Sequence, residues 1–223
     1  MSKKISLSKV QVLLLSLLAI SSVLIIEGVI GVAVNSLAIV SDAVHALFDV
    51  VATFILLLTT YLSMKPPDKE HTYGHGKIES IGGLIGGISL LALSGILVGE
   101  DIIRIVSGGE RVLPDYIGFI AILYTLCVDF FRIGILSRAT EGGSVTVRAN
   151  LYHAFSDFAS TIIALIGFGL SFGLYSYPTI SLYSDSFASI FLGMLLVYLS
   201  SKLIRNSVMA VSYTHLRAHE TVL

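Results

Sequence analysis

The sequence predicts an all-α membrane protein, folded as a bundle of six transmembrane helices with both termini in the cytoplasm. Of its 223 residues, 55% are hydrophobic and only 13% are charged, and the mean hydropathy of +0.89 is too high for a soluble domain. Six apolar stretches each approach the roughly 20 residues that a bilayer core requires. The connections between them are short, so neighbouring helices are expected to run antiparallel.

The predicted spans follow one another along nearly the whole chain. They are 10–32, 36–63, 79–103, 113–137, 146–173 and 183–210. Residues 1–211 are therefore assigned to one domain of six transmembrane helices. The start, Met1 to Lys4 followed by an apolar run, also fits a signal peptide, but the run lacks a convincing cleavage site and further spans follow.

Lysine and arginine set the predicted orientation, because cytoplasmic loops are enriched in both. One side of the predicted membrane holds most of them, namely Lys3, Lys4, Lys9, Lys65, Lys69, Lys77, Arg138, Arg148, Lys202 and Arg205, with Arg132 near it. The other side holds Arg104 and Arg111, among several acidic residues. The first side is predicted to face the cytoplasm.

Composition also excludes several classes of site. The single cysteine, Cys127, allows neither an internal disulfide nor a cysteine metal cluster. The sequence has no basic run or stacking pattern typical of nucleic-acid binding. The polar segment 212–223 resembles translated adaptor or cloning sequence and is predicted to be non-native, although its His215 and His219 have a spacing compatible with metal.

The first and third spans contain polar and small residues with ordinary structural explanations. Glu27 is expected to face other helices as a hydrogen-bonded carboxylate, because one buried acid does not make a ligand site. Gly82 with Gly86, and Gly83 with Gly87, form overlapping small-xxx-small pairs that predict close helix packing. A dimer contact there is the alternative.

The fourth span carries an acid and a base at helical spacing. Asp129 and Arg132 are three residues apart and are expected to neutralise each other on one helix face, with a part in proton movement as the alternative. The sixth span has no ionisable residue in its middle and is predicted to be scaffold.

The second and fifth spans carry the strongest functional signal, a His-x-x-x-Asp pair in each. His45 with Asp49, and His153 with Asp157, lie four residues apart, which places each pair on one helix face. One such pair alone could be a satisfied intramembrane hydrogen bond. Two matched pairs in separate spans indicate instead a shared site for one ion.

Two imidazoles and two carboxylates suit tetrahedral Zn²⁺, and also Co²⁺ or Fe²⁺. Asp42 and Asn150 each lie three residues before the histidine of a pair and are predicted to orient the ligands by hydrogen bonding. Metal competes with protons for ligand lone pairs, and histidine titrates at about pH 6.5, close to neutral. An inward proton gradient could therefore drive metal export.

A second candidate site lies in the loop after the second span. Asp68, His71 and His75 bring an acid and two imidazoles to the predicted cytoplasmic mouth, where three ligands would make a weaker, exchangeable site. The alternative is a solvated polar turn.

These motifs resemble those of the cation diffusion facilitator family of divalent-metal transporters. The two His-x-x-x-Asp pairs match the family's ligand pairs, His45 resembles its zinc-preferring branch, and residues 71–79 are similar to its second-loop signature. The resemblance implies six spans, a homodimer with Lys77 near the dimer contact, metal/proton exchange and alternating access. It also implies metal binding by Asp68, His71 and His75.

The resemblance implies an integral protein of a prokaryotic inner or plasma membrane that exports zinc, with Co²⁺, Fe²⁺, Cd²⁺ or Mn²⁺ as other substrates, and not an enzyme. Family members usually continue into a soluble cytoplasmic domain, which is expected to be missing after Val211. Two alternatives stay open. A proton-coupled carrier of another solute would need no metal, and an intramembrane metalloenzyme would need an open metal position and a motif such as His-Glu-x-x-His, which is absent from the sequence.

Overall fold

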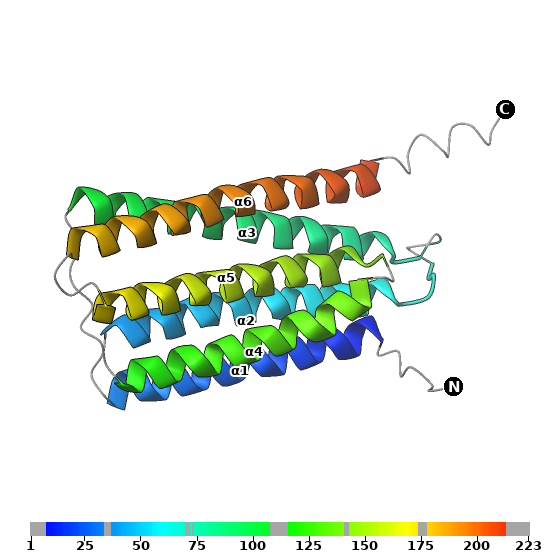
Figure 1. The fold of residues 1–223 in the computed structure, drawn as a ribbon. Coiled ribbons are helices and arrows are strands. Elements are labelled where there is room, and N and C mark those ends of the chain that lie inside the picture. Colours follow the sequence, from blue (N-terminus) through cyan, green and yellow to red (C-terminus); the bar gives the residue numbers. More distant parts are fainter. Residues whose placement is uncertain are drawn as a thin grey trace, which may run out of the picture.

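The computed structural model of the chain contains six helices side by side in one bundle (Figure 1). It describes residues 8–33, 37–69, 72, 74–107, 116–140, 143–173 and 178–212. The helices are α1 (Lys9–Ala33), α2 (Leu37–Ser63), α3 (Lys77–Val106), α4 (Tyr116–Ala139), α5 (Val145–Gly173) and α6 (Pro178–Ser212). Each predicted span falls on one helix. The largest difference is the start of α6, predicted at residue 183, because proline suits the first position of a helix.

The surface of the bundle is apolar and much of its interior is polar. Leu18, Phe48, Phe130 and Phe191 are each more than half exposed, whereas the buried side chains include serines, threonines, an asparagine, two aspartates and an arginine. This distribution is expected where lipid surrounds a helical protein. The described part of the chain contains five helices long and apolar enough to cross a membrane.

Helix α5 carries four polar or charged side chains, Arg148, Asn150, His153 and Asp157. Polar residues in a spanning helix are tolerated when they face the interior of the bundle. All four are buried or half-buried: Asn150 and His153 are buried, and Arg148 and Asp157 are half-buried. Crossing by all six helices stays a prediction.

The helices divide into two groups (Figure 1). α3 and α6 pack along each other, while α1, α2, α4 and α5 form the rest of the bundle, joined through the α1–α2 and α4–α5 pairs. The largest apolar cluster of the four-helix group joins α1, α4 and α5 through Val12, Leu13, Leu136, Val147 and Ala154. The first residues of α1 and the last residues of α6 lie at the same end of the bundle (Figure 1), which agrees with the predicted common side of the termini without fixing which side that is.

The glycines of α3 allow this packing, as predicted for the small-xxx-small pairs. A Cβ atom at Gly86 would lie 2.9 Å from the Cβ of Ala149 in α5 and 3.0 Å from the Cδ2 of Leu56 in α2. A Cβ atom at Gly87 would lie 2.7 Å from the Cγ1 of Ile204 in α6. The Gly82/Gly86 row therefore faces α2 and α5, and the Gly83/Gly87 row faces α6, with Val145 of α5 also close to Gly83. A dimer contact at these glycines stays untested.

Substitution of Gly87 by valine is expected to destabilise the fold by about 1–3 kcal/mol, because the added methyl groups would press into Ile204 and part α3 from α6. The thermal unfolding of the purified protein in detergent measures this effect. The matched control is Gly95→Val, because nothing lies within 4 Å of a Cβ atom at Gly95. Equal unfolding temperatures for the two variants would contradict the packing argument.

Polar contacts tie four helices together at the end where α1 begins. Lys9 Nζ of α1 lies 3.2 Å from Glu79 Oε2 of α3, and the Ser144 hydroxyl beside the start of α5 donates to the same carboxylate. The hydroxyls of Thr60 in α2 and Thr146 in α5 lie 2.5 Å apart. This end of the bundle is therefore fastened by specific side chains, and it is the end predicted to face the cytoplasm.

Candidate metal centre

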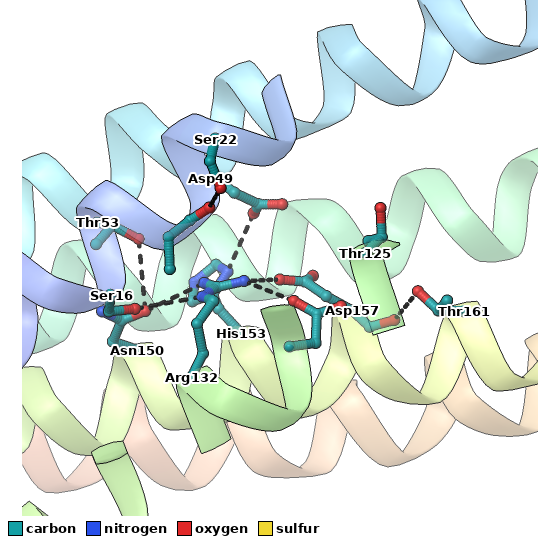
Figure 2. Close-up of polar contacts among 12 residues, drawn as sticks. Ser16, Ser22, Asp49, Thr53, Thr125, Arg132, Asn150, His153, Asp157 and Thr161 are labelled. Carbon is teal, nitrogen blue, oxygen red and sulfur yellow. Dashed lines mark hydrogen bonds and ion pairs between the residues drawn. The ribbon is translucent and has the colours of Figure 1, made fainter. Parts of the chain in front are cut away.

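The second and fifth spans meet at His153 and Asp49, as the two His-x-x-x-Asp pairs predict. Both side chains are buried, and His153 Nδ1 lies 3.7 Å from Asp49 Oδ1 (Figure 2). The other ring nitrogen, Nε2, lies 3.2 Å from the carbonyl oxygen of Gly86 and 3.3 Å from the Ser89 hydroxyl, both in α3. A carbonyl only accepts hydrogen bonds, so the bond to Gly86 requires the hydrogen to be on Nε2.

This arrangement leaves Nδ1 of His153 facing a carboxylate. At 3.7 Å the two atoms are too far apart for a hydrogen bond, and Nδ1 is buried without a hydrogen-bond partner among the described residues. In the neutral ring Nδ1 carries a lone pair, and a lone pair opposite a carboxylate oxygen is unfavourable unless a cation lies between or beside them. A proton on Nδ1 or a metal ion would satisfy this geometry.

Asp157, the second carboxylate of the predicted site, is held by an arginine. Arg132 Nη1 donates to Asp157 Oδ2 at 2.8 Å and to Asp129 Oδ1 at 3.0 Å (Figure 2). Arg132 and Asp129 are fully buried. The predicted pairing of Asp129 with Arg132 is therefore confirmed, but it is only part of the contact, because the guanidinium also reaches from α4 to α5.

Asn150 supports the arginine. Its Oδ1 accepts from Arg132 Nη2 at 3.5 Å and from Thr53 Oγ1 at 3.4 Å, and its Nδ2 donates to Ser16 Oγ at 3.2 Å. Arg132 Nε also donates to Ser16 Oγ, at 3.2 Å. In the described structure these contacts hold the guanidinium, whereas the prediction gave Asn150 the task of orienting a ligand histidine. The group that fixes His153 is the backbone of α3.

His45, the fourth predicted ligand, is half-buried one helical turn before Asp49 on α2. It lies near enough to Asp42 and to Glu27 of α1 to interact electrostatically with both. Asp42 is exposed. Glu27 is 6% exposed and accepts a hydrogen bond of 2.7 Å from the Thr125 hydroxyl of α4, which confirms the predicted hydrogen-bonded carboxylate.

The structure thus brings Asp49 to His153 and links Asp157 to the same cluster through Arg132, and His45 is half-buried one helical turn before Asp49. The described residues include no group of three or more His, Cys, Asp or Glu side chains positioned together to hold a metal ion. The site of four ligands, His45, Asp49, His153 and Asp157, therefore stays a prediction.

The loop site is described only in part. His75 Nε2 lies 3.4 Å from Asp68 Oδ2, so two of the three predicted loop ligands are paired. His71 lies outside the described residues, and so does the segment 213–223 of the predicted non-native tail. Lys77 is the exposed first residue of α3, and its predicted dimer contact is untested.

Sequence reasoning missed three contributors to the cluster. Ser16 of α1 is fully buried and binds both Arg132 and Asn150, but a serine in an apolar span carries little signal. The Gly86 carbonyl and Ser89 hydroxyl that contact His153 belong to a helix that was expected only to pack closely. The link from Arg132 to Asp157 had a visible signal, since an arginine inside an apolar span requires partners.

Comparison with known proteins places this cluster in context. Residues 13–210 match the family described as the cation efflux transmembrane domain. The chain is 34% identical over 188 residues to the manganese efflux system protein MneP of Bacillus subtilis, covering 81% of this chain and 60% of that protein. It is 31% identical over 143 residues to the zinc transporter ZitB of Yersinia pestis, covering 64% and 45%.

A third relative is the cadmium, cobalt and zinc/H(+)-K(+) antiporter of Bacillus velezensis, 27% identical over 161 residues, which covers 71% of this chain and 50% of that protein. The chain spans no more than 60% of the length of these three relatives. All three names describe proteins that move metal cations, and none describes an enzyme.

Proposed function

The chain belongs to the cation efflux family of membrane proteins, and from this premise we propose that it exports Zn²⁺ in exchange for protons. His45, Asp49, His153 and Asp157 are the proposed ligands. The observation that carries the proposal is the buried Nδ1 of His153, which faces the Asp49 carboxylate at 3.7 Å without a hydrogen bond. This pair of acceptors favours a cation between helices from the two halves of the chain.

The same pair of atoms explains the coupling to protons. Because Nε2 of His153 is engaged by the Gly86 carbonyl, a proton and a metal ion compete for the one remaining nitrogen. Metal binding at the cytoplasmic side would release protons, and protonation at the other side would release metal. If this one site opens first to one side of the membrane and then to the other, metal is exchanged for protons without a second ion site.

The ligand set favours zinc. Two imidazole nitrogens and two carboxylate oxygens suit Zn²⁺, whereas Mn²⁺ prefers carboxylate, carbonyl and water oxygens. His45, one helical turn before Asp49 on α2, would complete the shell. The relatives' names include zinc, manganese, cadmium and cobalt. The first experiment must therefore distinguish transport of Zn²⁺ from transport of Mn²⁺.

The remaining parts of the proposal concern assembly and entry. We place the protein in a prokaryotic inner or plasma membrane, with six crossings and with the Lys9–Glu79 end in the cytoplasm, as a homodimer that uses Lys77. The Asp68–His75 pair at 3.4 Å supports a weak loop site at that end, completed by His71. Such a site would supply ions to the buried one without holding them tightly.

The test is metal flux into proteoliposomes with an imposed pH gradient, using Zn²⁺, Mn²⁺, Co²⁺ and Cd²⁺ in turn. Wild type is expected to carry Zn²⁺ fastest, and His45→Ala is expected to lose most of that flux. Solute flux without any metal affinity would favour the carrier of another solute, and turnover of a substrate by the metal-loaded protein would favour an enzyme.

The variant His45→Asp is expected to shift selectivity from Zn²⁺ toward Mn²⁺ by about tenfold, because a third carboxylate replaces an imidazole. The ratio of the two fluxes measured in the same vesicles reports this change and is insensitive to the amount of active protein. An unchanged ratio would show that His45 does not contact the transported ion.

A further inference from the structure

Arg132 brings a fixed positive charge to a carboxylate that the proposed metal site needs. Its side chain is fully buried, and one nitrogen, Nη1, donates to Asp157 at 2.8 Å and to Asp129 at 3.0 Å. Figure 2 shows the guanidinium beside His153, pointing at Asp157. A divalent ion bound by Asp157 Oδ2 would take the lone pairs that Arg132 now uses, so the two cations compete for this atom.

Asp129 has a second carboxylate oxygen with which it could hold the Arg132 guanidinium without help from Asp157. Its Oδ1 accepts from Nη1, but its Oδ2 is buried and has no hydrogen-bond partner among the described residues. A buried carboxylate oxygen without a donor is costly. If the guanidinium left Asp157, a second N–H could be directed to Asp129 Oδ2, and the two groups would form the paired, parallel contact that arginine makes with carboxylates.

The formal charges of the cluster agree with this exchange. Asp49, Asp129 and Asp157 supply three negative charges and Arg132 supplies one positive charge, which leaves a charge of two minus. A divalent cation, or two protons, would bring the buried cluster to neutrality. Arg132 therefore offsets Asp129 and leaves the charge that one divalent ion requires.

We propose that Arg132 competes with the transported cation for Asp157, and that Asp129 receives the guanidinium when the cation binds. This inference rests on the proposed function and gives two residues outside the four ligands a part in it. Asp129 and Arg132 act as positioning residues. Their pair sets the net charge of the site and releases Asp157 only when another cation replaces the arginine.

Zn²⁺ binding to the purified full chain in detergent, measured by titration calorimetry, tests the proposal. Arg132→Gln removes the competitor and is expected to tighten Zn²⁺ binding about tenfold. Asp129→Asn removes the alternative acceptor and is expected to weaken binding about tenfold in wild type but threefold or less in the Arg132→Gln background. Arg138→Gln, an exposed arginine of the same helix, is the control and is expected to bind as wild type does.

Weaker binding by Arg132→Gln would overturn the proposal, as would an equal effect of Asp129→Asn in both backgrounds. Folding is checked by thermal unfolding. If the double variant does not fold, the single variant Asp129→Glu provides the test, because glutamate keeps the negative charge and both carboxylate oxygens. It is expected to bind within about threefold of wild type, and a loss equal to that of Asp129→Asn would overturn the proposal.

The same titrations separate this proposal from the proposed function. A wild-type chain that binds no Zn²⁺, or an Asp157→Ala variant with wild-type affinity, would contradict the metal site itself and with it the competition. Zinc binding that depends on Asp157 but is insensitive to Arg132 would contradict the competition alone.

Discussion

Replacement of Asp157 by alanine is expected to weaken Zn²⁺ binding by about a hundredfold or more, equivalent to about 2.7 kcal/mol, and to abolish transport. The variant removes one of the two carboxylates of the proposed site. It also leaves Arg132, which is fully buried and is held at 2.8 Å by Asp157 in the wild type, beside the site with its ion pair to Asp129 at 3.0 Å. A positive charge would then face the incoming cation. Titration calorimetry and vesicle flux measure the two effects.

The matched control for this variant is Thr161→Ala. Thr161 lies one turn after Asp157, and its hydroxyl donates to the Asp157 backbone carbonyl at 2.8 Å, so it tests the same helix without removing charge. It is expected to retain binding and flux within about threefold, as for a substitution that removes one local hydrogen bond. Zinc affinity equal in Asp157→Ala and wild type would exclude residue 157 from the site.

Reversal of the pH gradient across proteoliposomes is expected to reverse the direction of Zn²⁺ flux, and collapse of the gradient is expected to reduce flux by about tenfold or more. Each proton exchanged across one pH unit supplies about 1.4 kcal/mol. The physical reason is the single available nitrogen of His153, which a proton and a metal ion cannot share. A pH dye trapped in the vesicles and a zinc dye report the two movements together.

His153→Gln serves as the control for this coupling, because glutamine keeps a polar side chain but cannot exchange a proton near neutral pH. Residual flux through this variant is expected to be insensitive to the gradient. Wild-type flux that does not depend on pH would contradict exchange, while leaving metal transport by another driving force open.

The number of helices and their approximate bounds were predictable because each hydrophobic run is about as long as a helix that crosses a bilayer. The glycine rows of α3 were predictable for a similar reason, since small residues at i and i+4 create one smooth face. The contact between Asp49 and His153 followed from matching polar pairs in two spans, each of which needs a partner in an apolar surrounding.

The rest of the cluster depends on how neighbouring helices are rotated, which sequence spacing does not determine. Asp129 and Arg132 can satisfy each other on one helix, so nothing in their spacing required the further bond to Asp157. In the same way, Asn150 has the offset of a residue that orients histidine, yet the rotation of α5 against α1 turns it to Ser16 and Arg132.

The bond between His153 Nε2 and the Gly86 carbonyl crosses the boundary between the α3–α6 pair and the other four helices. A helix backbone cannot shift one carbonyl without carrying its neighbours, so any sliding of one group past the other would rotate or release the imidazole. The orientation of the imidazole therefore depends on how the α3–α6 pair is placed against the other four helices.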